Sequence, residues 1–153
     1  MELYLKDSQA TEKLGEVLGS KVQDGDVICL TGDLGAGKTL LTQGAAVALG
    51  IAAEDVTSPT FTIMNVYKGN ELELRHFDLY RLNRLEELED IGFYEYCGGD
   101  GVTFIEWAEL FPGALPEDYL QITLLHAENG RRALLEARGE RAQELLKEVE
   151  GQC

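Results

Sequence analysis

The sequence predicts an α/β fold in three layers, with a mixed, mostly parallel central sheet, flanking helices and antiparallel hairpins. Two apolar runs, Val27–Thr31 and Val102–Trp107, are typical of strands that are buried on both faces of a parallel sheet. A glycine-rich segment and then a helical segment follow the first run directly. Polar turn residues between later apolar segments indicate antiparallel hairpins, and mixed signals of this kind with flanking helices favour the α/β class.

The composition is that of one globular domain with an unusual charge. A chain of 153 residues is expected to form one domain, spanning residues 1–153, with a substantial core. Its 28 acidic and 13 basic residues give a formal charge of -15, which should repel a nucleic-acid backbone. Direct, unaided nucleic-acid binding is therefore not expected. The acidity favours either solubility or a specific basic partner, and both interpretations stay open.

Cysteine usage and the N-terminal sequence indicate the compartment. Cys29, Cys97 and Cys153 lie far apart and lack a C-x-x-C spacing, so neither a disulfide framework nor a zinc site is expected. Cys29 lies in an apolar run and is interpreted as a small core residue. The sequence begins without the basic start and long apolar stretch of a signal peptide, and no segment approaches membrane-spanning length. A cytoplasmic protein that does not bind membranes is expected.

The first half of the chain predicts a strand, a helix, a buried strand and a second helix. Leu14, Val17 and Leu18 space as one apolar helical stripe, and Ser8 precedes it as a suitable cap. Gly19 and Gly50 follow the expected helix ends, where glycine commonly stands. The expected elements are a short strand at Leu3–Leu5, a helix from Ser8 to about Leu18, the strand Val27–Thr31 and a helix at Lys38–Leu49.

The second half predicts two antiparallel strand pairs, a further buried strand and a terminal helix. The turn-forming segment Lys68–Glu71 separates the strands of the first pair, and Leu82, Leu85, Leu88 and Ile91 space as one helix face. The other expected elements are strands at Phe61–Tyr67 and Leu72–Tyr80, the strand Val102–Trp107, strands at Leu120–His126 and Arg132–Ala137, and a helix at Glu140–Val149.

The segment Gly32–Thr39 has the sequence of a phosphate-binding loop. It fits the pattern G-x-x-x-x-G-K-S/T, between an expected buried strand and an expected helix, as that pattern requires. Glycines let the backbone turn tightly so that successive N–H groups face phosphate oxygens, and the helix adds its positive N-terminal end. Lys38 is suited to reach the β- and γ-phosphates, and the Thr39 hydroxyl is suited to coordinate Mg²⁺. The sequence therefore predicts a P-loop NTPase domain that binds a nucleoside triphosphate with Mg²⁺.

Two carboxylates are candidates for the metal side of this site. P-loop enzymes usually hold Mg²⁺ with a further acid at the end of a neighbouring strand, and Glu106 ends the apolar run Val102–Ile105. Asp78 alternates with apolar neighbours, which predicts a polar face shared with His76 and Tyr80. That face either lines the active cleft or is merely solvated, and the pattern does not decide between the two.

Three further features have both a functional and a structural interpretation. The hydroxyl-rich loop Thr57–Thr60 is either a switch-like sensor of the γ-phosphate or a simple turn. Trp107 is either a core residue, which its residue type favours, or a partner contact. The isolated histidines, His76 and His126, are expected to be structural rather than ligands.

The nucleotide and the reaction are inferred by elimination. The Asn-Lys-x-Asp motif with which GTPases read guanine is missing, which favours ATP. No arginine finger is identifiable, although Arg75, Arg81 and Arg84 lie close in sequence, and such an incomplete site should hydrolyse ATP slowly unless a partner completes it. Two other classes stay open: a small-molecule kinase of the P-loop class, and a non-catalytic, nucleotide-gated binding module.

Four segments occur together in a distinctive order. They are Gly32–Thr39, Thr57–Phe61, His76–Leu82 and Ile105–Trp107. This set closely resembles the TsaE (YjeE) family, the ATPase component of bacterial tRNA threonylcarbamoyladenosine (t6A) biosynthesis. The P-loop pattern alone is shared by many families, whereas the Ser-Pro-Thr-Phe and His-x-Asp-x-Tyr-Arg combination is much more specific.

The resemblance implies a compact P-loop ATPase that is an accessory protein for tRNA modification. Its implied partners are a TsaD-like catalytic subunit and a TsaB-like subunit, and it would contact tRNA only indirectly, through them. It would not itself transfer the carbamoyl group, and its implied cofactors are ATP and Mg²⁺. Ala108 stands where many relatives have proline, and the region beyond Pro116 carries no site assignment.

The resemblance also implies roles for individual residues, by matching position. Lys38, Asp78 and Glu106 would serve catalysis, and Thr60 and Trp107 would belong to a switch-like or partner-coupling region. The implied nucleotide contacts are Thr11, Gly35, Ala36, Gly37, Lys38 and Thr39, and the implied Mg²⁺ ligands are Thr39 and Glu106.

Overall fold

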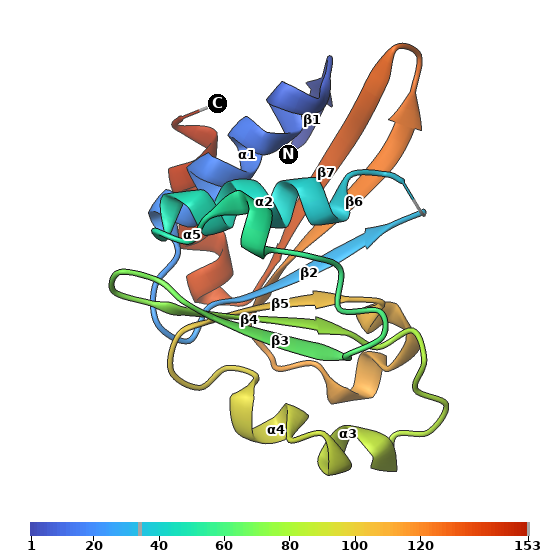
Figure 1. Cartoon of the computed structure of the whole chain (residues 1–153). Helices are drawn as coiled ribbons and strands as arrows, with labels where there is room; N and C mark the ends of the chain where they lie inside the picture. The colour runs from blue at the N-terminus through green and yellow to red at the C-terminus, as the bar shows by residue number, and fades with distance from the viewer. Residues whose placement is uncertain (34, 153) are drawn as a thin grey trace.

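The structure is a computed structural model that describes residues 1–33 and 35–152 (Figure 1). Leu34 of the expected phosphate loop and Cys153 lie outside the described residues. The strands are β1 (Glu2–Leu5), β2 (Val27–Gly32), β3 (Met64–Lys68), β4 (Glu73–Asp78), β5 (Val102–Glu106), β6 (Tyr119–Ala127) and β7 (Gly130–Arg138). The α-helices are α1 (Ser8–Lys21), α2 (Lys38–Ala48), α3 (Glu86–Asp90), α4 (Phe93–Tyr96) and α5 (Glu140–Glu150), and short 3₁₀ turns lie at Ala53–Asp55, Ala108–Leu110 and Pro112–Ala114.

The strands form one seven-stranded sheet in the order β1-β7-β6-β2-β5-β4-β3. Its central strands β6, β2, β5 and β4 pair in parallel, whereas β1 with β7, β7 with β6, and β3 with β4 pair antiparallel. The expected mixed, mostly parallel sheet with antiparallel hairpins is therefore confirmed. The parallel strands direct their carboxyl ends to one edge of the sheet, which is where open α/β folds bind ligands.

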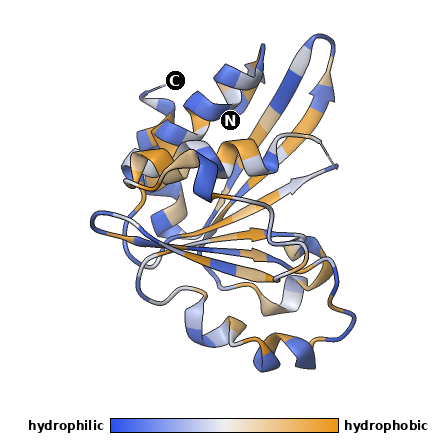
Figure 2. Ribbon diagram, viewed as in Figure 1, coloured by the Kyte–Doolittle hydropathy of each residue, from blue (hydrophilic) through white to orange (hydrophobic). Residues whose placement is uncertain are grey.

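Helices cover both faces of this sheet, which gives the expected three layers. α1, α2 and α5 lie on one face, and the short helices α3 and α4 lie on the other (Figure 1). Alternate residues of β2 supply two cores: Ile28 and Leu30 belong to the larger core with α1 and α2, and Val27 and Cys29 to the smaller core with α3 and α4. Figure 2 shows hydrophobic segments along the central strands.

The two described cysteines are a buried thiol, Cys29, and a partly buried one, Cys97. Cys29 is fully buried, as expected of a small core residue. Burial raises the pKa of its thiol, with smaller contributions in the same direction from Cys97 and Glu109. Burial also raises the pKa of Cys97 to about 12. Both thiols are therefore protonated at neutral pH, which makes them poor nucleophiles.

The expected ends of the first helix are wrong at both termini. Asp7, not Ser8, is the cap, because its carboxylate accepts a hydrogen bond from the backbone N–H of Ala10 at 2.8 Å. The helix does not stop before Gly19 but continues to Lys21. Glycine is needed at this position for a close contact between helices rather than for a helix end.

The apolar spacing between Leu82 and Ile91 does not form one helix face. Only the middle of the segment is helical, as α3, and a separate short helix, α4, begins after Gly92 at φ +77°. Leu82 and Leu88 are buried, but Leu85 is 49% exposed. The turns around α3 therefore rotate Leu85 away from the core that its spacing predicted.

The contact between α1 and α2 depends on glycine. A Cβ atom at Gly15 would overlap with the carbonyl oxygen of Leu41, and one at Gly44 would overlap with the carbonyl oxygen of Glu12. The two helices can approach so closely only because these side chains are missing. Since α1 carries Thr11 and α2 begins with Lys38 directly after the glycine-rich loop, this contact sets the distance between two parts of the candidate site.

The substitution Gly15→Ala should lower the free energy of unfolding by about 1–3 kcal/mol, because the added methyl group overpacks the helix contact. Gly113→Ala is the matched control, since nothing lies within 4 Å of its added Cβ. Urea unfolding of both variants measures the difference. Equal midpoints would contradict the close approach of α1 and α2.

Candidate functional site

The candidate site lies at the carboxyl ends of three neighbouring parallel strands. In the sheet register, Asp78 at the end of β4 is paired with Glu106 at the end of β5, and Glu106 is paired with Leu30 of β2. β2 ends at Gly32, and the glycine-rich loop follows it directly. The register therefore brings both candidate carboxylates to the edge of the sheet from which this loop departs.

The glycine-rich loop has a backbone shape suited to anions. Gly35 and Gly37 have φ values of +78° and +109°, a region that residues with side chains rarely adopt. α2, a helix of 11 residues, begins at Lys38 immediately after the second of these glycines. Its first backbone N–H groups have no partner within the helix, and its dipole favours negative charge at this end.

Lys38 is buried beside the loop, and its ammonium group has three neighbours. Nζ donates a hydrogen bond to the backbone carbonyl of Gly32 at 2.7 Å and lies 3.8 Å from Oε1 of Glu106. It also lies 4.5 Å from the ring centroid of Trp107, a cation–π contact. A carbonyl, a carboxylate and an aromatic face thus replace water around this buried charge.

Glu106 is 3% exposed, and its two oxygens have different partners. Oε1 faces Lys38, whereas Oε2 lies 2.6 Å from Nε2 of His76, which is fully buried. With Nε2 donating, His76 fixes the carboxylate so that its other oxygen is directed to the loop. No hydrogen-bond partner of His76 Nδ1 is found in the described part of the chain. The sequence predicted a structural role for His76, but no local pattern indicated its contact with Glu106.

Thr60 and Asp78 meet at the same edge of the sheet. Oγ1 of Thr60 donates a hydrogen bond to Oδ2 of Asp78 at 3.0 Å and lies 2.8 Å from the hydroxyl oxygen of Ser58. Oδ1 of Asp78 accepts a hydrogen bond from the backbone N–H of Tyr80 at 2.9 Å. Asp78 is buried like His76, but Tyr80 is 59% exposed. The alternation expected to place Tyr80 on the same face ends with β4 at Asp78.

Trp107 lies between the smaller core and the site. Its half-buried side chain packs against that core, and its ring contacts the Tyr80 ring with centroids 4.9 Å apart and the planes tilted by 47°. It also lines a cavity of about 410 Å³ together with Lys38, Thr39, Thr60, Asp78 and Glu106. The interpretation of Trp107 as a core residue is therefore incomplete, because its side chain also lines this cavity. We call this space the phosphate cavity.

Two non-glycine residues with positive φ border the site. Ile63 has φ +70° just before β3, and Trp107 has φ +63° just after β5. A turn closed by a hydrogen bond from the N–H of Ile63 to the carbonyl of Pro59, at 2.6 Å, precedes β3, so the strand expected from Phe61 begins only at Met64. A β-branched residue in this region is strained, and such strain is concentrated at functional segments.

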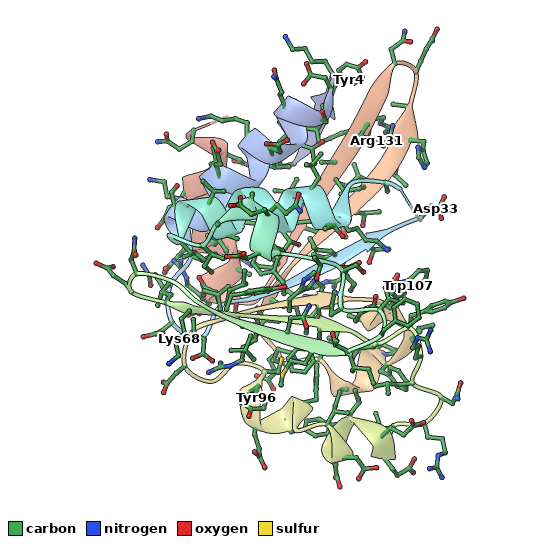
Figure 3. All side chains as sticks on the ribbon, in the orientation of Figure 1. Tyr4, Asp33, Lys68, Tyr96, Trp107 and Arg131 are labelled. Atoms are coloured by element: carbon green, nitrogen blue, oxygen red, sulfur yellow. The ribbon has the colours of Figure 1, made fainter. Side chains whose placement is uncertain are left out.

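A second cavity, of about 390 Å³, lies on the other side of the glycine-rich loop. It is lined by Thr11 of α1, by Gly35, Ala36 and Gly37 of the loop, and by Arg131 of β7. Nη2 of Arg131 donates a hydrogen bond to the carbonyl of Gly35 at 3.1 Å, across 96 positions of sequence. Figure 3 shows Arg131 on the β6–β7 hairpin. Sequence reasoning missed this residue, because nothing near it in the chain resembles a site motif.

The oxygen groups at the phosphate cavity fit Mg²⁺. Thr39, which carries a hydroxyl group, and Glu106, which carries a carboxylate, both line it. Mg²⁺ usually takes one or two protein oxygens and completes its octahedron with phosphate and water. No group of three or more His, Cys, Asp or Glu residues that could hold a metal ion is found in residues 1–33 and 35–152.

These features define the class of the protein, which is a mixed α/β protein with a mostly parallel seven-stranded sheet flanked by helices. A central parallel strand leads through a loop with two positive-φ glycines into a helix that begins with Lys38. The chain belongs to the family described as threonylcarbamoyl adenosine biosynthesis protein TsaE, whose model matches residues 5–134. The resemblance seen in the sequence is confirmed.

Relatives of known name match most of the chain. The tRNA threonylcarbamoyladenosine biosynthesis protein TsaE of Treponema pallidum is 42% identical over 134 residues, which cover 88% of this chain and 98% of that protein. The protein of the same name from Bacillus subtilis is 41% identical over 142 residues, covering 92% and 88%. The crystal structure of Bacillus subtilis YdiB has a TM-score of 0.83 and 33% identity, and the match covers 99% of this chain and 95% of that one. The fold prediction is thus confirmed by a solved relative.

Among the helices of residues 1–33 and 35–152, none combines the length and the apolar character needed to span a membrane.

His76→Ala should lower the free energy of unfolding by about 2–4 kcal/mol, because it leaves a cavity and removes the donor to the buried Glu106 carboxylate. His126→Ala is the matched control, since His126 is exposed and should change stability by less than about 0.5 kcal/mol. Chemical denaturation of the two variants gives both values. Equal stability of the two would contradict the His76–Glu106 contact.

Proposed function

We propose that this protein binds Mg-ATP at the glycine-rich loop and hydrolyses it slowly, as an accessory ATPase of tRNA threonylcarbamoyladenosine modification. The observation that carries the proposal is the meeting of Lys38, Thr39 and Glu106 at one cavity beside the loop. Backbone N–H groups, an ammonium, a hydroxyl and a carboxylate are together what a triphosphate with Mg²⁺ requires. The family and the names of its members supply the pathway.

On this proposal, one cavity binds the phosphates of the nucleotide and the other binds its nucleoside. Gly35 and Gly37 line both cavities, and Ala36 between them lines the cavity with Thr11. The backbone N–H groups of these three residues would bind the phosphate chain. The cavity with Thr11 and Arg131 would take the nucleoside. Lys38 would exchange its hydrogen bond to the Gly32 carbonyl for the β- and γ-phosphates, without moving far from its present position.

Thr39 and Glu106 would hold Mg²⁺, and the bound ion would neutralise part of the phosphate charge. The protein's own contribution is orientation. His76 holds one oxygen of Glu106, so the other oxygen is already directed to the loop before any ligand arrives. A group that hydrogen-bonds to a metal-binding carboxylate, as His76 does to Glu106, commonly tunes the affinity of the site for the metal ion.

Asp78 would act on the attacking water. Its carboxylate lines the phosphate cavity and is held by the Thr60 hydroxyl and by the backbone N–H of Tyr80. A carboxylate fixed in this way can accept a hydrogen bond from water and orient it. Lys38 is the only cationic side chain among the described residues that line this cavity, which supports slow hydrolysis in the absence of a partner.

The proposed setting is a cytoplasmic complex with TsaD-like and TsaB-like subunits. The charge of -15 supports contact with tRNA only through these partners, because an acidic chain repels the phosphate backbone. On this proposal the protein does not transfer the carbamoyl group, and ATP turnover acts on the partner complex. Partner binding would complete the site and accelerate hydrolysis.

Two variants should separate phosphate binding from metal use. Lys38→Ala should weaken Mg-ATP binding at least about tenfold, because a charge-assisted contact with the phosphates is lost. Glu106→Gln should change ATP affinity less but lower Mg²⁺-dependent turnover on the order of 100-fold. Calorimetry and phosphate release measure the two effects, and chelation of Mg²⁺ should reproduce the second in the unmodified protein. Lys68→Ala is the control, because Lys68 lies at the opposite end of the sheet from Trp107 (Figure 3).

Phosphate release also distinguishes the other classes. A P-loop kinase would release little phosphate without an added acceptor, and a nucleotide-gated binding module would bind ATP without turnover. Slow, Mg²⁺-dependent release without any acceptor is the result expected here. Fast release by the isolated protein would contradict the partner dependence.

A further inference from the structure

A further cavity opens beside the phosphate cavity and shares part of its lining with it. It has a volume of about 350 Å³ and is lined by Asp33, Thr60, Asp78, Tyr80 and Trp107. Three of these residues, Thr60, Asp78 and Trp107, also line the phosphate cavity, so the two spaces adjoin. Figure 3 shows Asp33 and Trp107 at the same margin of the molecule. We call this space the acidic–aromatic pocket.

The walls of the acidic–aromatic pocket combine carboxylates with ring faces. Asp33 is exposed, and each carboxylate oxygen of Asp78 accepts one hydrogen bond and retains capacity for another. The Tyr80 and Trp107 rings are tilted by 47° with respect to each other. A guanidinium group stacks on rings and donates hydrogen bonds in its own plane, so it suits this combination better than a compact ammonium does.

Aromatic rings around this margin already contact cations. Nζ of Lys38 lies 4.5 Å from the centroid of the Trp107 ring. Cζ of Arg81 lies 4.4 Å from the centroid of the Phe61 ring. Both contacts are internal to the chain, and each places a positive group over an aromatic ring.

We propose that the acidic–aromatic pocket binds an arginine side chain, which a partner protein projects from a basic loop. The inference rests on the proposed function, because the pocket adjoins the cavity assigned to the phosphates. A guanidinium placed here would add a second cation beside the γ-phosphate, next to Lys38. Such a group stabilises the charge of the transition state, so docking of the partner would raise the rate of hydrolysis.

Charge selects a protein loop over RNA as the occupant. Single-stranded RNA could stack its bases on Tyr80 and Trp107. Its phosphates, however, would meet Asp33 and Asp78 in a chain that carries a charge of -15. A basic protein segment gains from the same carboxylates that RNA would have to overcome.

Two exposed aromatic residues, Tyr80 of the pocket lining and Phe61 next to Thr60 in sequence, supply apolar contact for such a partner. Phe61 is 81% exposed and Tyr80 is 59% exposed, although both are large and apolar over most of their surface. Large aromatic anchors around a desolvated cationic contact are typical of the residues that dominate protein–protein binding energy. The pocket and these exposed aromatic residues therefore have the composition of an interface centre.

The test measures how tightly the protein, with Mg-ATP bound, associates with the partner subunits proposed above. Tyr80→Leu should weaken this association at least about tenfold and remove the stimulation of phosphate release, because it removes a ring from the pocket. Tyr80→Phe should stay within about twofold of the unmodified protein, since the ring is retained. Tyr94→Leu is the matched control, because Tyr94 is an exposed tyrosine of α4 outside the pocket. Asp33→Asn should also weaken association, through the lost carboxylate.

A double-mutant cycle then identifies the arginine. Changing one exposed arginine of the partner to alanine should weaken the association about tenfold, as Tyr80→Leu does. The two changes together should weaken the association about tenfold rather than about a hundredfold, because both remove the same contact. Independent losses for every partner arginine would overturn the proposal. So would loss of tRNA affinity by Tyr80→Leu while affinity for the partner subunits is unchanged, because that result would assign the pocket to RNA.

The same measurements separate this inference from the proposed function. If the unmodified protein fails to bind Mg-ATP, the proposed function itself fails. If the unmodified protein binds ATP and is stimulated by its partners, but Tyr80→Leu is stimulated equally, only the assignment of the pocket fails. Nucleotide affinity and basal turnover of each variant are therefore measured first, without partners.

Discussion

The buried carboxylate of Glu106 is the group on which the geometry of the site depends. It stands between Lys38 Nζ, 3.8 Å from one oxygen, and His76 Nε2, 2.6 Å from the other. A buried carboxylate needs such partners, because removal of either leaves charge without compensation in a dry environment. Its partners come from α2 and β4, while Glu106 itself ends β5. One charged group thus joins the helix after the glycine-rich loop to two strands of the sheet.

The glycine-rich loop is supported from two further directions. The close contact of α1 with α2 places a methyl group of Thr11 about 3.4 Å from where a Cβ of Gly37 would lie. The β6–β7 hairpin brings Arg131 to the carbonyl of Gly35. Segments from the beginning, middle and end of the chain therefore hold the loop in place. A site arranged before its ligand binds loses less free energy to reorganisation than one that must order itself.

Features that depend on consecutive residues were predictable, and contacts between distant ones were not. The strands β2 and β5, the glycine-rich loop and the hairpin turns follow from local apolar runs and turn residues. The contacts of His76 with Glu106 and of Arg131 with Gly35 join residues 30 and 96 positions apart, and no spacing rule reports them. Gly19 was misassigned because glycine serves both helix ends and close helix contacts, and the local sequence does not distinguish these uses.

The most direct test of the central claim is a crystal structure with Mg²⁺ and a non-hydrolysable ATP analogue. We expect the triphosphate to lie along Gly35–Lys38, with Nζ of Lys38 bonded to phosphate oxygens instead of the Gly32 carbonyl. We also expect Glu106 to keep its contact with His76 while its other oxygen faces the metal. Triphosphate bound elsewhere, with Lys38 still bonded to the Gly32 carbonyl, would contradict the central claim.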